Sequence, residues 1–175
     1  EDKRRRMQEF TELVERSHQA KLDVIIDFVP NHVAREYHST CKPRGVEDLG
    51  ENDNPQWAFS PLNNFYYMNE PFHPQFDTQD YHEEPARATG NDCFTAQPSK
   101  NDWYETIKLN YGVFYQGGGE QQFDPIPSTW YKMLHILLFW SSKGVDGFRC
   151  DMAEMVPQAF WSWVIPQVKE QYPNM

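Results

Sequence analysis

The chain has 175 residues, which is enough for one domain with a hydrophobic core. Its 26 acidic residues outnumber its 16 basic residues, and the formal net charge of -10 argues against nucleic acid or an anionic membrane surface as a partner. No apolar run approaches the ~20 residues that span a bilayer, so we expect no membrane span.

The first predicted elements are an amphipathic helix and a strand. Residues 3–20 carry apolar side chains at helical spacing, with charge elsewhere. Residues 24–29 are almost continuously β-branched or aromatic, which is typical of a parallel strand covered on both faces. Asp27 interrupts this run, and Asn31 and His32 follow where the strand ends. Polar groups therefore gather at the carboxyl end of a predicted core strand.

Between residues 33 and 127 the pattern changes. The stretch is rich in Asn, Asp, Pro, Gly and aromatic residues, and only short pieces at 106–109 and 113–115 resemble strands. About 95 residues without a long element are too many for an ordinary loop, so we predict a small inserted domain. We expect most of its aromatic side chains to form a local core, and Gly117 to Gly119 fit either a hinge or a surface turn.

Regular patterns return after the insert. Ser128 is predicted to cap a helix that stops at Gly144, a short strand covers residues 145–151, and a second helix covers 157–172 with a kink at Pro166. Two such strands joined through a helical crossover predict a parallel α/β unit with both strands close together in one sheet.

Arg149 and Asp151 are the unusual residues of the second strand. By alternation they share one face. Buried charges are costly unless they are paired, so they form either a structural ion pair or a site that uses the charge. Ligands of α/β sheets bind at the carboxyl ends of the strands, where Asp27 and His32 should face the same opening. This placement favours the functional interpretation.

These residues resemble two sequence regions of the alpha-amylase superfamily, glycoside hydrolase family 13. The first region, Asp-x-x-x-Asn-His, is matched by Asp27, Asn31 and His32, and the second, Gly-Phe-Arg-x-Asp, is matched by residues 147–151. The resemblance covers nearly the whole chain. It implies an α/β fold, a partial (β/α)8 TIM barrel from helix 2 to helix 4, with an irregular B domain inserted after strand 3.

The same resemblance divides the chain into three parts. Residues 1–32 would be helix 2 and strand 3, residues 33–127 the B domain, and residues 128–175 helix 3, strand 4 and helix 4. Because a complete barrel needs roughly 250 residues, the remainder of the barrel is needed as well.

The resemblance implies a retaining glycoside hydrolase that cleaves α-glucosidic bonds in starch-like α-glucans. Asp151 would be the nucleophile that forms a covalent glycosyl intermediate, and Arg149 beside it would favour the carboxylate. Asp27 would support this pair and, with His32, bind the substrate; Asn31 is a candidate ligand of a structural calcium ion. No organic cofactor is implied, and the expected partner is an oligo- or polysaccharide.

Three of these residues also fit purely structural roles. Asp27 would also fit a buried partner of Arg149, His32 a capping or packing histidine, and Asn31 an ordinary turn residue.

The chain also departs from the family pattern. Many members carry Lys-His where this chain has Glu154 and Met155, so the substrate stays open. The family's acid/base Glu comes from a fifth strand, and we do not expect Glu154 to replace it. We therefore expect the 175 residues alone to be inactive.

Two other interpretations remain, a non-catalytic binding or scaffold relative and an unrelated α/β enzyme whose motifs match by chance. A pure scaffold has no use for an ionised Arg149–Asp151 pair, which argues against the first. Cys41 and Cys93 would pair only in an oxidising compartment, and the compartment is left open. Cys150 is expected to be a small buried hydrophobe on the back of its strand.

Overall fold

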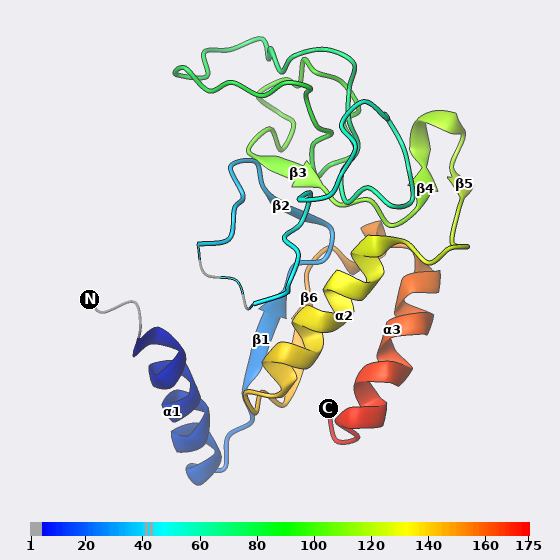
Figure 1. Ribbon diagram of the computed structural model, residues 1–175. Coiled ribbons are helices and arrows are strands. Elements are labelled where there is room, and N and C mark those ends of the chain that lie inside the picture. Colours follow the sequence, from blue (N-terminus) through cyan, green and yellow to red (C-terminus); the bar gives the residue numbers. More distant parts are fainter. Residues whose placement is uncertain (1–4, 41, 43) are drawn as a thin grey trace.

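The helix–strand–helix–strand–helix order expected around the insert is present (Figure 1). The computed structural model describes residues 5–40, 42 and 44–175. The two strands are parallel neighbours, with Asp27 directly opposite Arg149, so the predicted parallel unit is confirmed. In chain order the elements are α1 (Arg6–Gln19), β1 (Ile25–Phe28), α2 (Ser128–Ser141), β6 (Gly147–Cys150) and α3 (Gln158–Gln171).

The start of α2 differs from the prediction. Ser128 lies in the first turn of the helix, the N-cap is Pro127, and no side chain caps it. The Ser128 hydroxyl donates to the carbonyl of Leu62 at 2.8 Å and accepts from the amide of Asn64 at 2.9 Å. The serine therefore ties α2 to the preceding segment. At the other end of the chain, α3 continues through Pro166.

The β1–β6 pair is covered on one face in the part of the chain that the structure describes, where the sequence predicted two covered faces. Phe28 is buried, and its ring lies 6.1 Å from Phe148 and 6.4 Å from Trp161 on α3. On the opposite face Ile25 is 64% exposed and Val29 is 41% exposed. The reason is that the helices of this two-stranded unit pack against one side of it.

The main hydrophobic core lies between the covered strand face, α2 and α3. It continues into the segment between β1 and α2, because buried rings from that segment pack against the same helices. Helix α1 joins the rest through buried Val14 and through the ring of Phe10, which lies 5.2 Å from that of Trp140. The buried core members are Phe28, Phe65, Tyr67, Ile107, Leu109, Tyr111, Trp130, Met133, Leu137, Val156, Phe160, Val164 and Val168.

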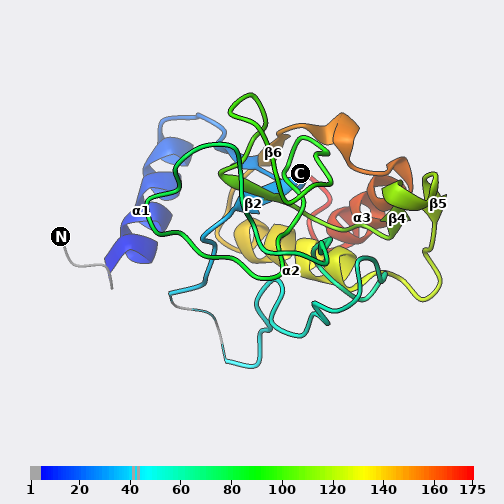
Figure 2. The same ribbon diagram turned by 90° about the horizontal axis from the view of Figure 1, so that it is seen from above.

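The long segment between β1 and α2, which we call the excursion, lies over the carboxyl end of β1 (Figures 1 and 2). Two short antiparallel pairs give it order, and two of its strands begin at the predicted positions. Gly118 and Gly119 have positive φ in the turn that joins one of these pairs, which agrees with a surface turn. The pairs are β2 (His32–Ala34) with β3 (Thr106–Lys108), and β4 (Val113–Phe114) with β5 (Glu120–Gln121). The 3-10 helix η2 (Tyr115–Gly117) follows β4, and the 3-10 helix η3 (Ala153–Met155) lies outside the excursion, after β6.

The excursion also has the local core expected from its aromatic residues. Tyr66, Met68 and Phe72 pack there with three buried alanines. Phe65 and Tyr67 instead belong to the main core, because alternation along this stretch sends neighbouring rings to opposite sides.

Neither the helices nor the cysteines of the described residues point to a membrane or a disulfide. None of these helices is long and apolar enough to cross a membrane. Cys93 and Cys150 are free thiols, and Cys150 is half-buried against the main core. Cys41 lies outside the described residues, so the question whether it pairs with Cys93, which the sequence left open, stays open.

Candidate active site

Arg149 connects two carboxylates at the carboxyl ends of β1 and β6. Its Nη1 lies 3.2 Å from Oδ2 of Asp27 and 2.9 Å from Oδ1 of Asp151. The expected contact between Asp27 and Arg149 is therefore present. The side chain of Arg149 is 60% exposed and that of Asp151 is 27% exposed. In the described residues these charges thus form an open cluster that a ligand can reach, rather than a buried ion pair.

The backbone fixes Asp151 at the tip of the sheet. Its N–H donates to the carbonyl of Phe28 at 2.8 Å, which extends the β1–β6 hydrogen bonding by one step. Met152 then adopts a left-handed conformation, with φ of 50°, and turns the chain into η3. A side chain at positive φ costs on the order of 1 kcal/mol, and such strain concentrates at functional sites.

The pKa of His32 responds to the charge of Asp151. Burial lowers the pKa of His32; the Asp151 carboxylate acts in the opposite direction and raises it, while the Lys108 ammonium lowers it. That His32 and Asp151 share one opening stays a prediction. The edge of Trp103 also packs on His32, with ring centroids 5.5 Å apart.

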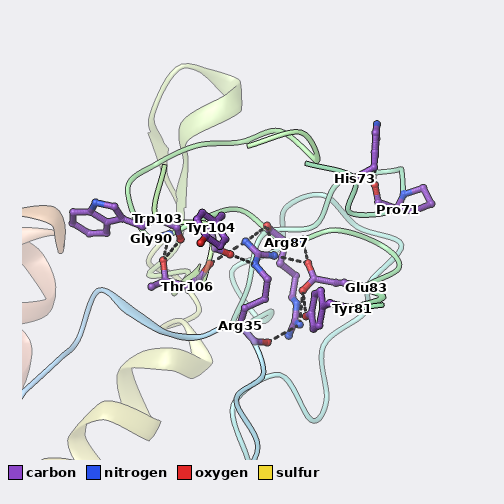
Figure 3. Close-up of polar contacts among 10 residues, drawn as sticks. All are labelled: Arg35, Pro71, His73, Tyr81, Glu83, Arg87, Gly90, Trp103, Tyr104 and Thr106. Atoms are coloured by element: carbon purple, nitrogen blue, oxygen red, sulfur yellow. Dashed lines mark hydrogen bonds and ion pairs between the residues drawn. The ribbon is translucent and has the colours of Figure 1, made fainter. Parts of the chain in front are cut away.

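Gly90 makes room for the histidine. A Cβ atom at this glycine would lie 2.9 Å from Cβ of His32 and 2.7 Å from Oγ1 of Thr106, so any larger residue would push one of them aside. The Thr106 hydroxyl accepts from the Gly90 N–H at 2.9 Å and lies 2.7 Å from the Trp103 carbonyl. Figure 3 shows Gly90, Thr106 and Trp103 side by side.

The side chain of Asn31, the candidate calcium ligand, already has partners for its amide oxygen and its amide nitrogen. The side chain is buried, and its Nδ2 donates to the Gly90 carbonyl at 2.7 Å. Its Oδ1 accepts from the Lys108 ammonium at 2.8 Å, and the same ammonium lies 2.5 Å from Oδ1 of Asp92. Because a fixed cation already binds the oxygens that calcium would need, the side chains around Asn31 do not fit that ion.

A buried charge network supports the segment that carries Trp103 (Figure 3). Arg35 donates through Nη1 to Glu83 at 2.6 Å and through Nε to the Tyr104 carbonyl at 2.6 Å. Arg87 binds the other oxygen of Glu83 at 2.8 Å. Burial raises the pKa of Tyr81 to about 12, and its hydrogen bond to Glu83 adds to the effect.

Lys108, Gly90 and the Arg35 network were not identified from the sequence. Lys108 had one usable signal, a cation inside the predicted strand at 106–109, where an apolar residue is expected. Glu154 lies in η3, directly after β6. It lines a hollow of about 450 Å³ together with Cys150 and Trp161, on the side of β6 that faces away from Arg149.

Comparison with known proteins gives consistent results. The family model described as the catalytic domain of alpha amylase matches residues 5–174. An alpha-1,4-glucan:maltose-1-phosphate maltosyltransferase of Cereibacter sphaeroides is 35% identical over 89 residues, which are 51% of this chain and 13% of that protein. The protein of the same name in Methylacidiphilum infernorum is 42% identical over 47 residues, 27% of this chain and 7% of that protein. The chain therefore spans only a small part of these relatives.

Two solved structures are similar to most of the chain. The alpha-amylase of Geobacillus thermoleovorans, complexed with acarbose, has a TM-score of 0.48 and 19% identity, over 94% of this chain and 26% of that one. The maltogenic amylase of S. marinus has a TM-score of 0.49 and 18% identity, over 96% of this chain and 23% of that one.

Proposed function

This chain belongs to the alpha-amylase family, and we propose that it carries the nucleophile of a retaining enzyme that acts on α-glucosidic bonds of α-glucans. Membership implies a partial TIM-barrel-like fold. Within that barrel we assign α1, α2 and α3 to helices 2, 3 and 4, β1 and β6 to strands 3 and 4, and the excursion to an inserted B domain. The observation that carries the proposal is Arg149, which bridges Asp27 and Asp151 at an open strand end.

In the proposed reaction Asp151 attacks the anomeric carbon and the glucosidic bond breaks, leaving a covalent glycosyl–Asp151 intermediate. A second carboxyl group, about 5 Å away in retaining enzymes, protonates the leaving oxygen. Arg149 holds Asp151 in place, Asp27 holds Arg149, and His32 donates a hydrogen bond to the bound sugar. We do not assign the proton donor to Glu154, which lines a hollow on the other side of β6.

The acceptor that releases this intermediate separates two candidate activities. Water gives hydrolysis, the activity expected from the sequence, whereas a phosphate or sugar acceptor gives transfer. The names of the curated relatives favour transfer of a maltosyl unit as the second candidate. Incubating the longest natural chain that includes residues 1–175 with an α-1,4-glucan, with and without inorganic phosphate, distinguishes hydrolysis from transfer to phosphate. Hydrolysis releases free reducing sugar in both cases, and transfer to phosphate forms maltose 1-phosphate only when phosphate is present.

Replacement of the proposed nucleophile tests the assignment in the longest natural chain that includes residues 1–175. We expect Asp151→Asn to lower turnover by at least about a thousandfold and to leave glucan binding nearly unchanged, because the amide cannot attack the anomeric carbon. The matched control is Asp146→Asn, at the opposite end of β6, where the carboxylate binds His18 and the N–H of Val24. Unchanged turnover in Asp151→Asn would end the assignment of Asp151 as the nucleophile, whereas absence of turnover in the wild type would favour the non-catalytic alternative.

We further propose that residues 1–175 by themselves do not turn over glucan. The reaction needs a proton donor opposite Asp151, and we assign that role to none of their carboxyl groups. The measurement is the release of reducing sugar from soluble starch by the purified 175 residues. Robust hydrolysis would refute this part of the proposal.

A further inference from the structure

We propose that the ammonium group of Lys108 takes the place of a divalent cation at Asn31, so that the junction between β1 and the excursion is held without calcium at this position. This inference rests on the contacts of Lys108 and does not depend on the proposed reaction.

Lys108 is a built-in part of the junction. It lies on β3 directly opposite His32 on β2, and it is only 1% exposed. Its ammonium contacts two oxygens, Oδ1 of Asn31 at 2.8 Å and Oδ1 of Asp92 at 2.5 Å, and lies 5.4 Å from the centre of the Tyr115 ring. A buried ammonium is costly unless it is paired, and here two of its three N–H donors meet oxygens while Asp92 supplies the opposite charge.

The same oxygens cannot serve a calcium ion as well. Calcium binds six to eight oxygens at about 2.3–2.6 Å, and Asn31 and Asp92 would supply two of them. A divalent ion on either oxygen would lie within a few ångströms of the buried Lys108 ammonium, and like charges at that distance repel. The Lys108 ammonium and a calcium ion therefore exclude each other at these oxygens, and the ammonium occupies the position.

The lysine also joins segments that are far apart in the sequence. Asn31 follows β1, Asp92 belongs to the excursion, and Lys108 is on β3. Asn31 in turn donates to the carbonyl of Gly90, and the side chain of His32 packs against this glycine. Lys108 therefore connects the loop that carries Gly90 and Asp92 to the end of β1. A bound cation at this position would have the same structural role.

The first test measures calcium binding through the melting temperature of the longest natural chain that includes residues 1–175. Wild type and Asp92→Asn are compared in millimolar Ca²⁺ and in EDTA. The variant removes the negative charge on which a calcium site here would depend, and asparagine tolerates the positive φ of 63° at this position. We expect the same Ca²⁺-induced shift in both proteins. A rise of more than about 2 °C in wild type that Asp92→Asn lacks would overturn the proposal.

The second test removes the ammonium. We expect Lys108→Met to lower the melting temperature by several degrees more than Lys132→Met, a matched control. Lys132 also binds an asparagine oxygen, Oδ1 of Asn64, at 2.9 Å, but that oxygen keeps a second donor in the N–H of Gly50 at 2.9 Å. The described residues give Asn31 Oδ1 no donor besides Lys108. Equal or smaller loss in Lys108→Met would contradict the role of the lysine, and the calcium comparison decides the question if this variant does not fold.

Discussion

The amide of Asn31 has one chemically consistent orientation. The Lys108 ammonium can only donate hydrogen bonds, so the atom facing it must be the amide oxygen. The amide nitrogen then faces Nδ1 of His32 at 3.3 Å. A neutral His32 therefore accepts at Nδ1 and carries its hydrogen on Nε2, which leaves Nε2 as the donor for a bound sugar. Protonation would set two donors against each other, in agreement with the lowered pKa of His32.

This geometry predicts a pH dependence of stability. The pKa of His32 in the folded chain lies below the usual value of 6.5, chiefly because of burial. Between the two pKa values the unfolded chain binds more protons than the folded one, so stability increases with pH in that range. His32 thus destabilises the fold as the pH falls from 6.5 through its folded pKa. We expect the free energy of unfolding of wild type to decrease more over this range than that of His32→Gln.

The measurement is denaturant unfolding of the longest natural chain that includes residues 1–175, at several pH values above and below 6.5. His73→Gln is the control, because that histidine is exposed on the excursion. Parallel curves for wild type and His32→Gln would show that the histidine is as easily protonated in the folded chain as in the unfolded one.

At the scale of elements, the Arg35 network determines how the excursion is held. Two guanidinium groups share the carboxylate of Glu83, and Arg35 also donates to the carbonyls of Tyr104 and Thr106. We expect Glu83→Gln to lower the free energy of unfolding by about 3 kcal/mol, because it leaves two arginines without their counter-charge, one of them fully buried.

Glu84→Gln is the matched control for this variant, since the neighbouring glutamate is exposed and should change stability by less than about 0.5 kcal/mol. Chemical denaturation of both variants gives the comparison. Similar losses for Glu83→Gln and Glu84→Gln would mean that the network contributes little to the stability of the excursion.

The sequence predicted the regular elements and the strand-end polar residues because both follow from local periodicity. β1 and β6 lie within the ranges predicted for them, residues 24–29 and 145–151, and alternation placed Arg149 and Asp151 on the same face. The Lys108–Asn31 contact joins residues 77 positions apart, and the Arg35–Glu83 pair joins residues 48 positions apart. No local pattern encodes such distances, and short strands such as β2 depend on their partner rather than on their own propensity.

At the scale of the whole molecule, the candidate site lies on the same face of the β1–β6 pair as the exposed apolar residues. Ile25, Asp27 and Val29 lie on the face of β1 that the described residues leave open, and Arg149 lies beside them on β6. In a (β/α)8 barrel the helices cover the outer face of the strands, and the inner face is packed by side chains from the other strands. The proposed barrel therefore explains both the apolar residues on this face and the charged residues at its carboxyl end.

A substitution of Ile25 tests whether this face is covered in the longest natural chain that includes residues 1–175. Ile25 is 64% exposed in the described residues and Leu22, before β1, is 61% exposed, so the two should respond alike if both face water. If β1 instead lines a barrel, Ile25→Ala removes packed methyl groups and should lower the free energy of unfolding by about 2–4 kcal/mol. Leu22→Ala, outside the barrel wall, should change it by less than about 0.5 kcal/mol. Denaturant unfolding of both variants provides the values, and equally small changes would mean that the inner face is not packed and that the partial barrel stays open.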